Sequence, residues 1–273
     1  MIPVTQHHFR PGDPLFTQRT PRVVSAVKLH RRRDRDKAGR FLAEGPQAVR
    51  EALAAGAVRE LFVTESGRTR HRELLHGEPF SVVTDDAMDA LADTVVPQGV
   101  VAVCDLLDIP LDAALAKRPR LVAVAVEIRD PGNAGTVLRT ADAAGADAVV
   151  FAGDAVDPYN PKCVRSSAGS LFHLDVVRAP DAAATLAALR GAGLRTLATS
   201  GYGAADLDDL IDDGSLAAPT AWLFGSEAHG LPDELRDAAD TAVRVPIHGR
   251  AESLNLAAAA AVCLYASARA HRR

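Results

Sequence analysis

Three short segments combine glycine with charged or amide side chains of the kind that bind ligands. Asn133 and Arg139 follow an apolar stretch that ends at residue 126, and Glu227 follows another that ends at residue 224. Ser253 and Asn255 stand at the start of an alanine-rich stretch. Glycine lets a backbone approach a ligand closely, and a helix N-terminus attracts an anion. These three segments are therefore the first candidates for a binding or catalytic site.

The first segment has two alternative interpretations besides catalysis. Gly132 and Gly135 give the spacing GxxG, whereas a dinucleotide fingerprint has GxGxxG. Asp154 lies about where a ribose-binding acid is expected, which keeps a degenerate dinucleotide site open. The other interpretation is a tight strand-to-helix turn with Arg139 on the surface.

In the second and third segments, a purely structural role explains some polar residues but not others. A carboxylate in a glycine-bounded loop, as at Glu227, needs a partner or a shifted pKa. His229 is interpreted as an exposed loop histidine, because no further ligand lies at metal spacing. Ser253 is predicted to be the N-cap of a helix over 254–269. Asn255 then falls in the first turn, where asparagine is a poor helix former and needs a local reason.

A fourth segment, residues 158–170, carries Lys162 and Arg165. These cations could meet phosphate, or they could form the polar face of a short helix. Cys163 is expected to be a packed thiol, because no adjacent base is evident. The three cysteines are far apart and form no CxxC pair, which argues against a disulfide framework and a zinc site. A reducing cytoplasm is the expected compartment.

The candidate loops sit in an alternating pattern of strands and helices. Apolar strands separated by helices predict a parallel sheet covered on both faces, with ligands beyond the carboxyl ends of its strands. The predicted strands of this sheet are 121–126, 147–151, 173–177, 194–199, 220–224 and 242–246. A smaller α/β unit precedes it, with strands 40–44, 60–64, 80–83 and 100–105 and helices 46–55, 68–75 and 85–92. The predicted division is a leader 1–21, a first domain 22–105, a linker 106–120 and a second domain 121–273.

The charge is unevenly distributed along the 273 residues. The net charge is −4, but residues 1–40 sum to +7 and the rest to −11. Basic N-terminal arms commonly contact nucleic-acid phosphates, although a solvated helix face is an equally good interpretation. The composition excludes a wholly disordered, collagen-like or disulfide-rich chain. The longest apolar run, 256–266, is too short to cross a bilayer, so we expect no membrane segment.

Taken together and in this order, the segments resemble a known family. NAGTVLRTADAAGA at 133–146, LFGSEAHGLP at 223–232 and VPIHGRAESLNLAAAAAV at 245–262 resemble the three motifs of the SpoU (TrmH-type) RNA ribose methyltransferases of the SPOUT superfamily. KCVRSSAGSLFHL at 162–174 is similar to the stretch between the first two motifs. FLAEGPQAVREALAAG at 41–56 is similar to the substrate-binding domain that often precedes them.

The resemblance implies a fold and an activity. The fold is an α/β SPOUT-type parallel sheet with a C-terminal trefoil knot, preceded by a small L30e-like substrate-binding domain. The activity is transfer of a methyl group from S-adenosylmethionine to a ribose 2′-hydroxyl of RNA by a cytoplasmic homodimer, without a metal. The extra domain favours large-subunit ribosomal RNA, with transfer RNA as the alternative. A dinucleotide-dependent oxidoreductase and a catalytically silent RNA-binding protein are the competing classes.

The resemblance also assigns roles by position. Arg139 is expected to grip the RNA phosphate and orient the hydroxyl, while the other polar residues fix substrate and cofactor. The catalytic residues are Arg139, Asn133, Glu227, Ser253 and Asn255. The cofactor-binding residues are Gly225, Ser226, Gly230, Val245, Pro246, Ile247, Ser253, Leu254 and Asn255. The RNA-binding residues are Arg31, Arg32, Arg33, Lys162 and Arg165. The chain departs from the family's usual text at Ile247-His248 and at Ala257.

Overall fold

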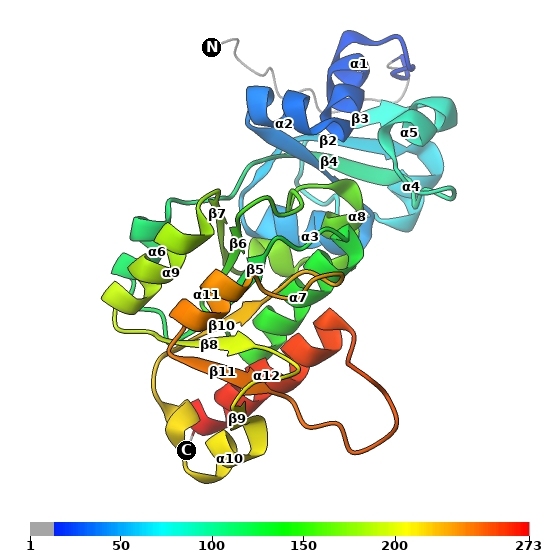
Figure 1. The fold of residues 1–273 in the computed structure, drawn as a ribbon. Helices are drawn as coiled ribbons and strands as arrows, with labels where there is room; N and C mark the ends of the chain where they lie inside the picture. The colour runs from blue at the N-terminus through cyan, green and yellow to red at the C-terminus, as the bar shows by residue number, and fades with distance from the viewer. Residues whose placement is uncertain (1–13, 273) are drawn as a thin grey trace. The chain divides into compact units, whose positions relative to one another are not determined.

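The structure is a computed structural model that describes residues 14–272 (Figure 1). The chain forms two compact units. The N-terminal unit comprises the described residues up to Leu106 together with Tyr159–Phe172, and the C-terminal unit comprises Leu107–Pro158 and the chain from His173 onward. Most of the predicted leader 1–21 lies outside the described residues. The predicted domain bounds place 159–172 with the second domain, whereas here this segment is part of the N-terminal unit.

The N-terminal unit is built on a four-stranded sheet in the order β1-β4-β2-β3. Its strands are β1 (Arg40–Glu44), β2 (Val58–Thr64), β3 (Ser81–Val83) and β4 (Val100–Asp105). β4 is antiparallel to both β1 and β2, while β2 and β3 are parallel. Phe16 extends the β3 edge through a parallel bridge to Val83. Residues 80–83 and 100–105 are thus strands close to where the sequence predicts them.

Short helices surround this sheet, and local sequence explains where several of them begin. They are α1 (Pro21–Val27), α2 (Arg32–Ala38), α3 (Pro46–Ala54), α4 (Glu65–Arg70) and α5 (Asp85–Leu91), with the 3-10 helix η1 (Lys28–His30). α1 and α3 open with proline in the first turn, where its missing N–H is not needed. The hydroxyl of Thr64 caps α4 and that of Thr84 caps α5. Leu42, Phe62, Met88 and Val101 belong to the core between sheet and helices.

The segment Tyr159–Phe172 completes the N-terminal unit. It contains α8 (Pro161–Ser166) and the 3-10 helix η2 (Ser170–Phe172). The Phe41 ring of β1 lies 4.8 Å from the ring centroid of Tyr159 and 5.9 Å from that of Phe172. Both contacts bury aromatic surface, so this segment is held to β1 by apolar packing.

The C-terminal unit is built on a parallel seven-stranded sheet in the order β7-β6-β5-β10-β8-β11-β9. Its strands are β5 (Leu121–Val126), β6 (Ala148–Ala152), β7 (Asp175–Ala179), β8 (Arg195–Thr199), β9 (Ala205–Asp206), β10 (Thr220–Phe224) and β11 (Thr241–Arg244). The predicted parallel α/β sheet is confirmed. The short edge strand β9 is an addition that the sequence did not indicate.

Helices cover both faces of this sheet (Figure 1). One layer consists of α6 (Leu111–Ala116), α9 (Ala182–Gly191) and α11 (Asp233–Ala238), and the other contains α7 (Pro131–Ala144) and α12 (Leu256–His271). α10 (Leu207–Asp212) and the 3-10 helix η3 (Ser215–Ala217) lie against α12. Val122, Val124 and Leu223 face the α6–α9–α11 layer. On the other face the buried Trp222 indole donates a hydrogen bond to the Ser267 hydroxyl of α12 at 2.9 Å.

Further predictions concern the cysteines, membrane-spanning segments and the knot. Cys104, Cys163 and Cys263 are all buried free thiols. Burial raises the pKa of Cys263 to about 12, so its thiolate is disfavoured at neutral pH. None of the helices within residues 14–272 is both long and apolar enough to cross a membrane. The trefoil knot that the resemblance implies stays a prediction.

Candidate active site and cofactor cavity

The predicted motifs meet at one edge of the C-terminal sheet. The strands are parallel, so the loops that follow β5, β10, β8 and β11 all emerge at the carboxyl edge. β10 lies between β5 and β8, which places the second motif beside the first. The chain then returns from β11 through residues 245–255 into α12, which packs against α7.

The first motif lies on α7 rather than in the loop before it. The sequence predicts that this helix begins at Thr136, but it begins at Pro131, and this prediction is wrong. Proline occupies the first turn, and the Asp130 carboxylate caps the helix by accepting from the Asn133 N–H at 2.8 Å. Asn133 therefore lies in the first turn. Arg139 is exposed, and its guanidinium has no hydrogen-bond or ion-pair partner within residues 14–272.

The second motif forms a closed loop after β10. Ser226 N–H donates to Gly230 O at 3.0 Å, and Gly230 N–H donates to Ser226 O at 2.8 Å. A Cβ atom at Gly225 would lie 2.1 Å from the backbone carbon of Gly230 and 2.2 Å from the Leu231 nitrogen. Only glycine fits at position 225, because the returning backbone occupies the space of a side chain.

The third motif shows that the predicted N-cap is wrong. Asn255, not Ser253, caps α12, which begins at Leu256. The Asn255 Oδ1 accepts from the N–H groups of Ala257 and Ala258 at 2.9 and 3.4 Å. Asparagine is among the best N-caps, and this is the local reason for an amide at position 255. Ser253 is exposed and lies two residues before the cap.

Side chains of the three motifs form one hydrogen-bonded network, which we call the Asn133 network (Asn133, Glu227 and Asn255). Asn133 Nδ2 donates to Glu227 Oε1 at 2.8 Å. Asn255 Nδ2 donates to Asn133 Oδ1 at 3.3 Å. Glu227 thus has a hydrogen-bond partner, as expected for a carboxylate in a glycine-bounded loop. Because Asn133 donates in one direction and accepts in the other, it joins residues far apart in the sequence into one fixed arrangement.

A cavity of about 640 Å³ opens beside this network. Its lining includes most of the predicted cofactor-binding residues, namely Gly225, Ser226, Gly230, Val245, Ile247, Ser253, Leu254 and Asn255, as well as Glu227. Pro246 is not in the lining, and neither Asn133 nor Arg139 is. His229 is exposed, as expected, and lies in the lining too.

One wall of this cavity is formed by residues outside the predicted motifs. Thr199, Ser200, Gly201 and Tyr202 follow β8 and line it, with the Tyr202 side chain fully exposed. A Cβ atom at Gly203 would lie 2.6 Å from the Val243 carbonyl carbon, so this loop folds tightly against β11. The signal was available in the sequence. A Gly-Tyr-Gly turn follows the predicted strand 194–199, and loops after parallel strands are where ligands bind.

The candidate RNA-binding residues all lie in the N-terminal unit. Arg31, Arg32 and Arg33 are exposed, at and just after the start of α2, with Arg32 3.9 Å from Asp36 and Arg33 4.0 Å from Asp34. The neighbouring Arg35 is buried and donates to the Leu29 and His30 carbonyls, each at 2.9 Å.

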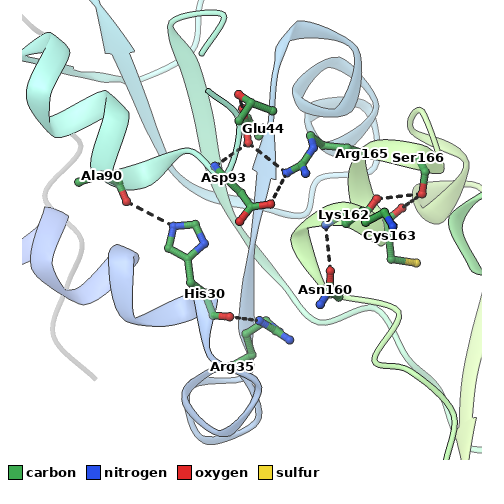
Figure 2. A network of polar contacts seen from close by, with 11 residues as sticks. His30, Arg35, Glu44, Ala90, Asp93, Asn160, Lys162, Cys163, Arg165 and Ser166 are labelled. Carbon is green, nitrogen blue, oxygen red and sulfur yellow. Dashed lines mark hydrogen bonds and ion pairs between the residues drawn. The ribbon is translucent and has the colours of Figure 1, made fainter. Parts of the chain in front are cut away.

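The two candidates on α8 differ in their surroundings (Figure 2). Lys162 is exposed in the first turn of α8. The Arg165 Nη1 lies 2.9 Å from Asp93 Oδ2 and 3.5 Å from Glu44 Oε2. The charge of Arg165 is therefore opposed by two carboxylates of its own unit.

Two family models match the chain. The SpoU rRNA Methylase family matches residues 120–265, and the MRM3-like substrate binding domain matches residues 20–102. This chain belongs to the SpoU rRNA methylase family. The range 120–265 holds all three motifs of the site and all seven strands of the C-terminal sheet.

Curated proteins and solved structures agree with this membership. The chain is 36% identical to the 23S rRNA (guanosine(2553)-2′-O)-methyltransferase RlmP of Bacillus subtilis, over 89% of this chain and 94% of that protein. The crystal structure of the SpoU methyltransferase AviRb from Streptomyces viridochromogenes with the cofactor AdoMet is similar, with a TM-score of 0.80 and 33% identity over 92% of this chain and 98% of that one. The AdoMet-bound rRNA methyltransferase from Sinorhizobium meliloti has a TM-score of 0.80 and 31% identity, covering 92% and 95%.

Proposed function

We propose that this protein transfers the methyl group of S-adenosylmethionine to a ribose 2′-hydroxyl of ribosomal RNA. The observation that carries the proposal is the Asn133 network, which joins polar residues of all three motifs, two of which line one cavity. Family membership supports the same chemistry, because the relatives and similar structures named above are rRNA methyltransferases or SpoU methyltransferases.

The cavity residues fit the cofactor. A volume of about 640 Å³ is in the ordinary range for a small-molecule site. Val245, Ile247 and Leu254 offer apolar surface to an adenosine, and Ser253 with Glu227 offers polar groups to its hydroxyls and to the amino-acid part. Gly225 lets the backbone of the closed loop approach the ligand without a side chain in between. When bound, S-adenosylmethionine supplies an electrophilic methyl group on a sulfonium.

The protein's contribution is to position the ribose. Arg139 projects from α7, two turns after its start, with its guanidinium available for an RNA phosphate. An arginine side chain stays protonated in proteins, so we assign Arg139 to phosphate binding and hydroxyl orientation. The Asn133 network holds the α7, β10 and α12 loops in register around the acceptor. Alignment of this kind can lower a barrier by about 7–11 kcal/mol.

We also propose that the protein works as a cytoplasmic homodimer on large-subunit rRNA. Val262 and Tyr265 of α12 are 44% and 53% exposed, and they lie on one helix face with the exposed Ala258 and Arg269. Such a stripe on an otherwise buried helix suits a second copy of the chain. The Bacillus subtilis relative acts on 23S rRNA by name, and that supports the large subunit as the source of substrate.

Two measurements test the proposed function. Calorimetric titration of the purified protein with S-adenosylmethionine and with NAD should give saturable binding of the first alone. Mapping of ribose methylation in rRNA from cells with and without the gene should show one 2′-O-methyl group lost. Binding of NAD but not of S-adenosylmethionine would return the chain to the dinucleotide interpretation.

A further inference from the structure

A second cavity, of about 270 Å³, lies wholly within the N-terminal unit. Its walls come from the end of β1, the start of α3, the loop between α5 and β4, and the α8 segment. The lining residues are Glu44, Gly45, Gln47, Ala48, Thr94, Val96, Gln98, Arg165 and Ala168. Neither the catalytic chemistry nor the packing of the core accounts for a cavity at this place.

The loop over residues 93–98 is held at both ends. At its start, Asp93 N–H donates to Glu44 Oε2 at 3.0 Å and the Thr94 hydroxyl donates to Glu44 Oε1. After its end, the Gly99 carbonyl accepts from the Thr64 N–H at 3.0 Å. A loop anchored in this way presents its side chains in a fixed arrangement before any ligand arrives, which reduces the ordering needed on binding.

Two apolar side chains project from this anchored loop into solvent. Val95 is 99% exposed and Val96 is 80% exposed, and Val96 lies at the edge of the cavity. A single exposed valine is ordinary, but two neighbours on a fixed loop beside a cavity form an apolar surface that a flat group can cover. Gln98 follows them, and its side chain is exposed beside the same cavity.

The charges around the cavity disfavour an anion. Figure 2 shows Arg165 directed at Glu44 and Asp93, so the guanidinium in the lining is already paired with carboxylates. A phosphate placed here would have to compete with these two carboxylates for Arg165. The remaining polar groups are the amides of Gln47 and Gln98, each with a donor and an acceptor. This arrangement suits a neutral, planar, hydrogen-bonding ligand.

We propose that the cavity binds one unpaired nucleobase of the RNA substrate, an inference that rests on the proposed function. Sequence-specific RNA recognition targets splayed-out bases, which are contacted on their edges by amides and on their faces by flat or apolar groups. Gln47 and Gln98 read the edge of the base, and Val96 covers its face. Arg50, one turn after Gln47 on α3 and 3.5 Å from its Oε1, is placed to meet the phosphate next to that base.

The test measures RNA affinity as a function of salt. The full-length protein and its Gln47→Ala, Gln98→Ala and Val96→Ser variants are titrated with rRNA purified from cells lacking the gene, over a series of KCl concentrations. Gln18→Ala is the matched control, since Gln18 is an exposed glutamine of the same unit that donates to the Asp86 carbonyl outside the cavity. We expect each cavity variant to weaken binding about three- to tenfold with no change in the salt slope, and the control to bind like wild type.

The alternative results separate the possible ligands. Arg50→Ala should reduce the salt slope by about one, because a phosphate contact releases a counterion. If the glutamine variants also reduce the slope, the cavity is a phosphate site and the nucleobase proposal is wrong. If they bind like Gln18→Ala, the cavity has no part in RNA recognition. Calorimetry with S-adenosylmethionine on the same samples tests the proposed function separately, because none of these residues lies in the cofactor cavity.

Discussion

The side-chain amide of Asn133 lies 2.8 Å from Oε1 of Glu227, and this hydrogen bond joins the first turn of α7 to the loop after β10. The two residues are 94 positions apart in the sequence. Asn255 extends the link to the start of α12 by donating to the other end of the Asn133 amide. Three segments that carry the candidate site residues are thereby held by side chains as well as by the sheet beneath them.

Asn255 caps α12 and also donates a hydrogen bond to Asn133, and two substitutions separate these roles. Asn255→Asp keeps an N-cap acceptor but removes the donor to Asn133, whereas Asn255→Ala removes both. We expect Asn255→Ala to lower the free energy of unfolding by about 1 kcal/mol and Asn255→Asp to change it little. Both should lower methyl transfer by a similar large factor. Urea unfolding and single-turnover transfer provide the two measurements, and full activity of Asn255→Asp would exclude the network from the mechanism.

Substitution of Arg139 should lower methyl transfer without changing the affinity for the cofactor. Its side chain does not line the cofactor cavity and is exposed on α7. Arg139→Ala should therefore bind S-adenosylmethionine with unchanged affinity in calorimetry while transfer falls by about 100-fold or more. Arg129→Ala is a suitable control, because that arginine is paired with Asp154 at 2.6 Å in the preceding loop. Wild-type turnover of the Arg139 variant would overturn its assignment.

Gly225 has no room for a side chain. A Cβ atom there would overlap the Gly230–Leu231 backbone, so Gly225→Ala has to open the closed loop. We expect the loss of S-adenosylmethionine binding in calorimetry with the sheet intact by circular dichroism. Gly249→Ala serves as the control, since nothing lies within 4 Å of a Cβ atom at that position. Equal cofactor affinity in both variants would contradict the account of the second motif.

Protonation of Asp240 should lower the stability of the protein at acid pH. Burial by itself raises the pKa of this carboxyl, but hydrogen bonds from the Thr196 N–H and hydroxyl, each 2.8 Å, and the charge of Arg190 hold it below its ordinary value. The unfolded chain then binds the proton more readily, so the stabilisation is present above a pH of about 4 and is lost as pH falls through the folded pKa. Asp240→Ala should lower the free energy of unfolding by about 1–2 kcal/mol at pH 7.

The difference between wild type and Asp240→Ala should shrink as the pH is lowered from 5 to 3.5. Urea unfolding at several pH values measures it. Asp212→Ala supplies a comparison for the removal of an aspartate, because Asp212 is an exposed residue of α10 in the same unit. A difference that stays constant, or grows, toward acid pH would contradict the depressed pKa of Asp240.

The exposed arginines at α2 should contribute to RNA binding through charge. Replacing Arg31, Arg32 and Arg33 together by alanine should weaken binding of rRNA and reduce the salt slope, by about one for each phosphate contact removed. Filter binding over a range of KCl concentrations measures the slope. Arg35 is left unchanged in this variant because it is buried and supports the Leu29 and His30 carbonyls. An unchanged slope would show that the three arginines form a solvated helix face that does not contact RNA phosphates.

Local sequence predicted the elements better than it predicted their partners. The predicted bounds of β5 and β10 match the structure, because a strand buried on both faces is a continuous apolar run in the sequence. The start of α7 was misplaced because Asp130 and Pro131 look like loop residues until one acts as a cap and the other as the first helical residue. The cap of α12 was misplaced in the same way, with Ser253 preferred over Asn255.

What could not be predicted depends on contacts between distant segments. Nothing local to residues 159–172 indicates that Tyr159 and Phe172 pack on Phe41 of the N-terminal unit. The pairing of Arg165 with Glu44 and Asp93 is likewise invisible in the sequence, which made Arg165 look like a free phosphate ligand. The candidate site residues, in contrast, lie in family motifs that follow the strand ends, and their roles stay predictions.

Alkaline hydrolysis of the product RNA distinguishes ribose methylation from base methylation. The purified protein is incubated with methyl-labelled S-adenosylmethionine and with rRNA from cells lacking the gene, and the RNA is then hydrolysed with alkali. A methyl group on a ribose 2′-oxygen blocks cleavage at that nucleotide, so we predict one labelled, alkali-resistant dinucleotide with wild type and none with Arg139→Ala. Label recovered only in mononucleotides would place the methyl group on a base, and this would contradict the account.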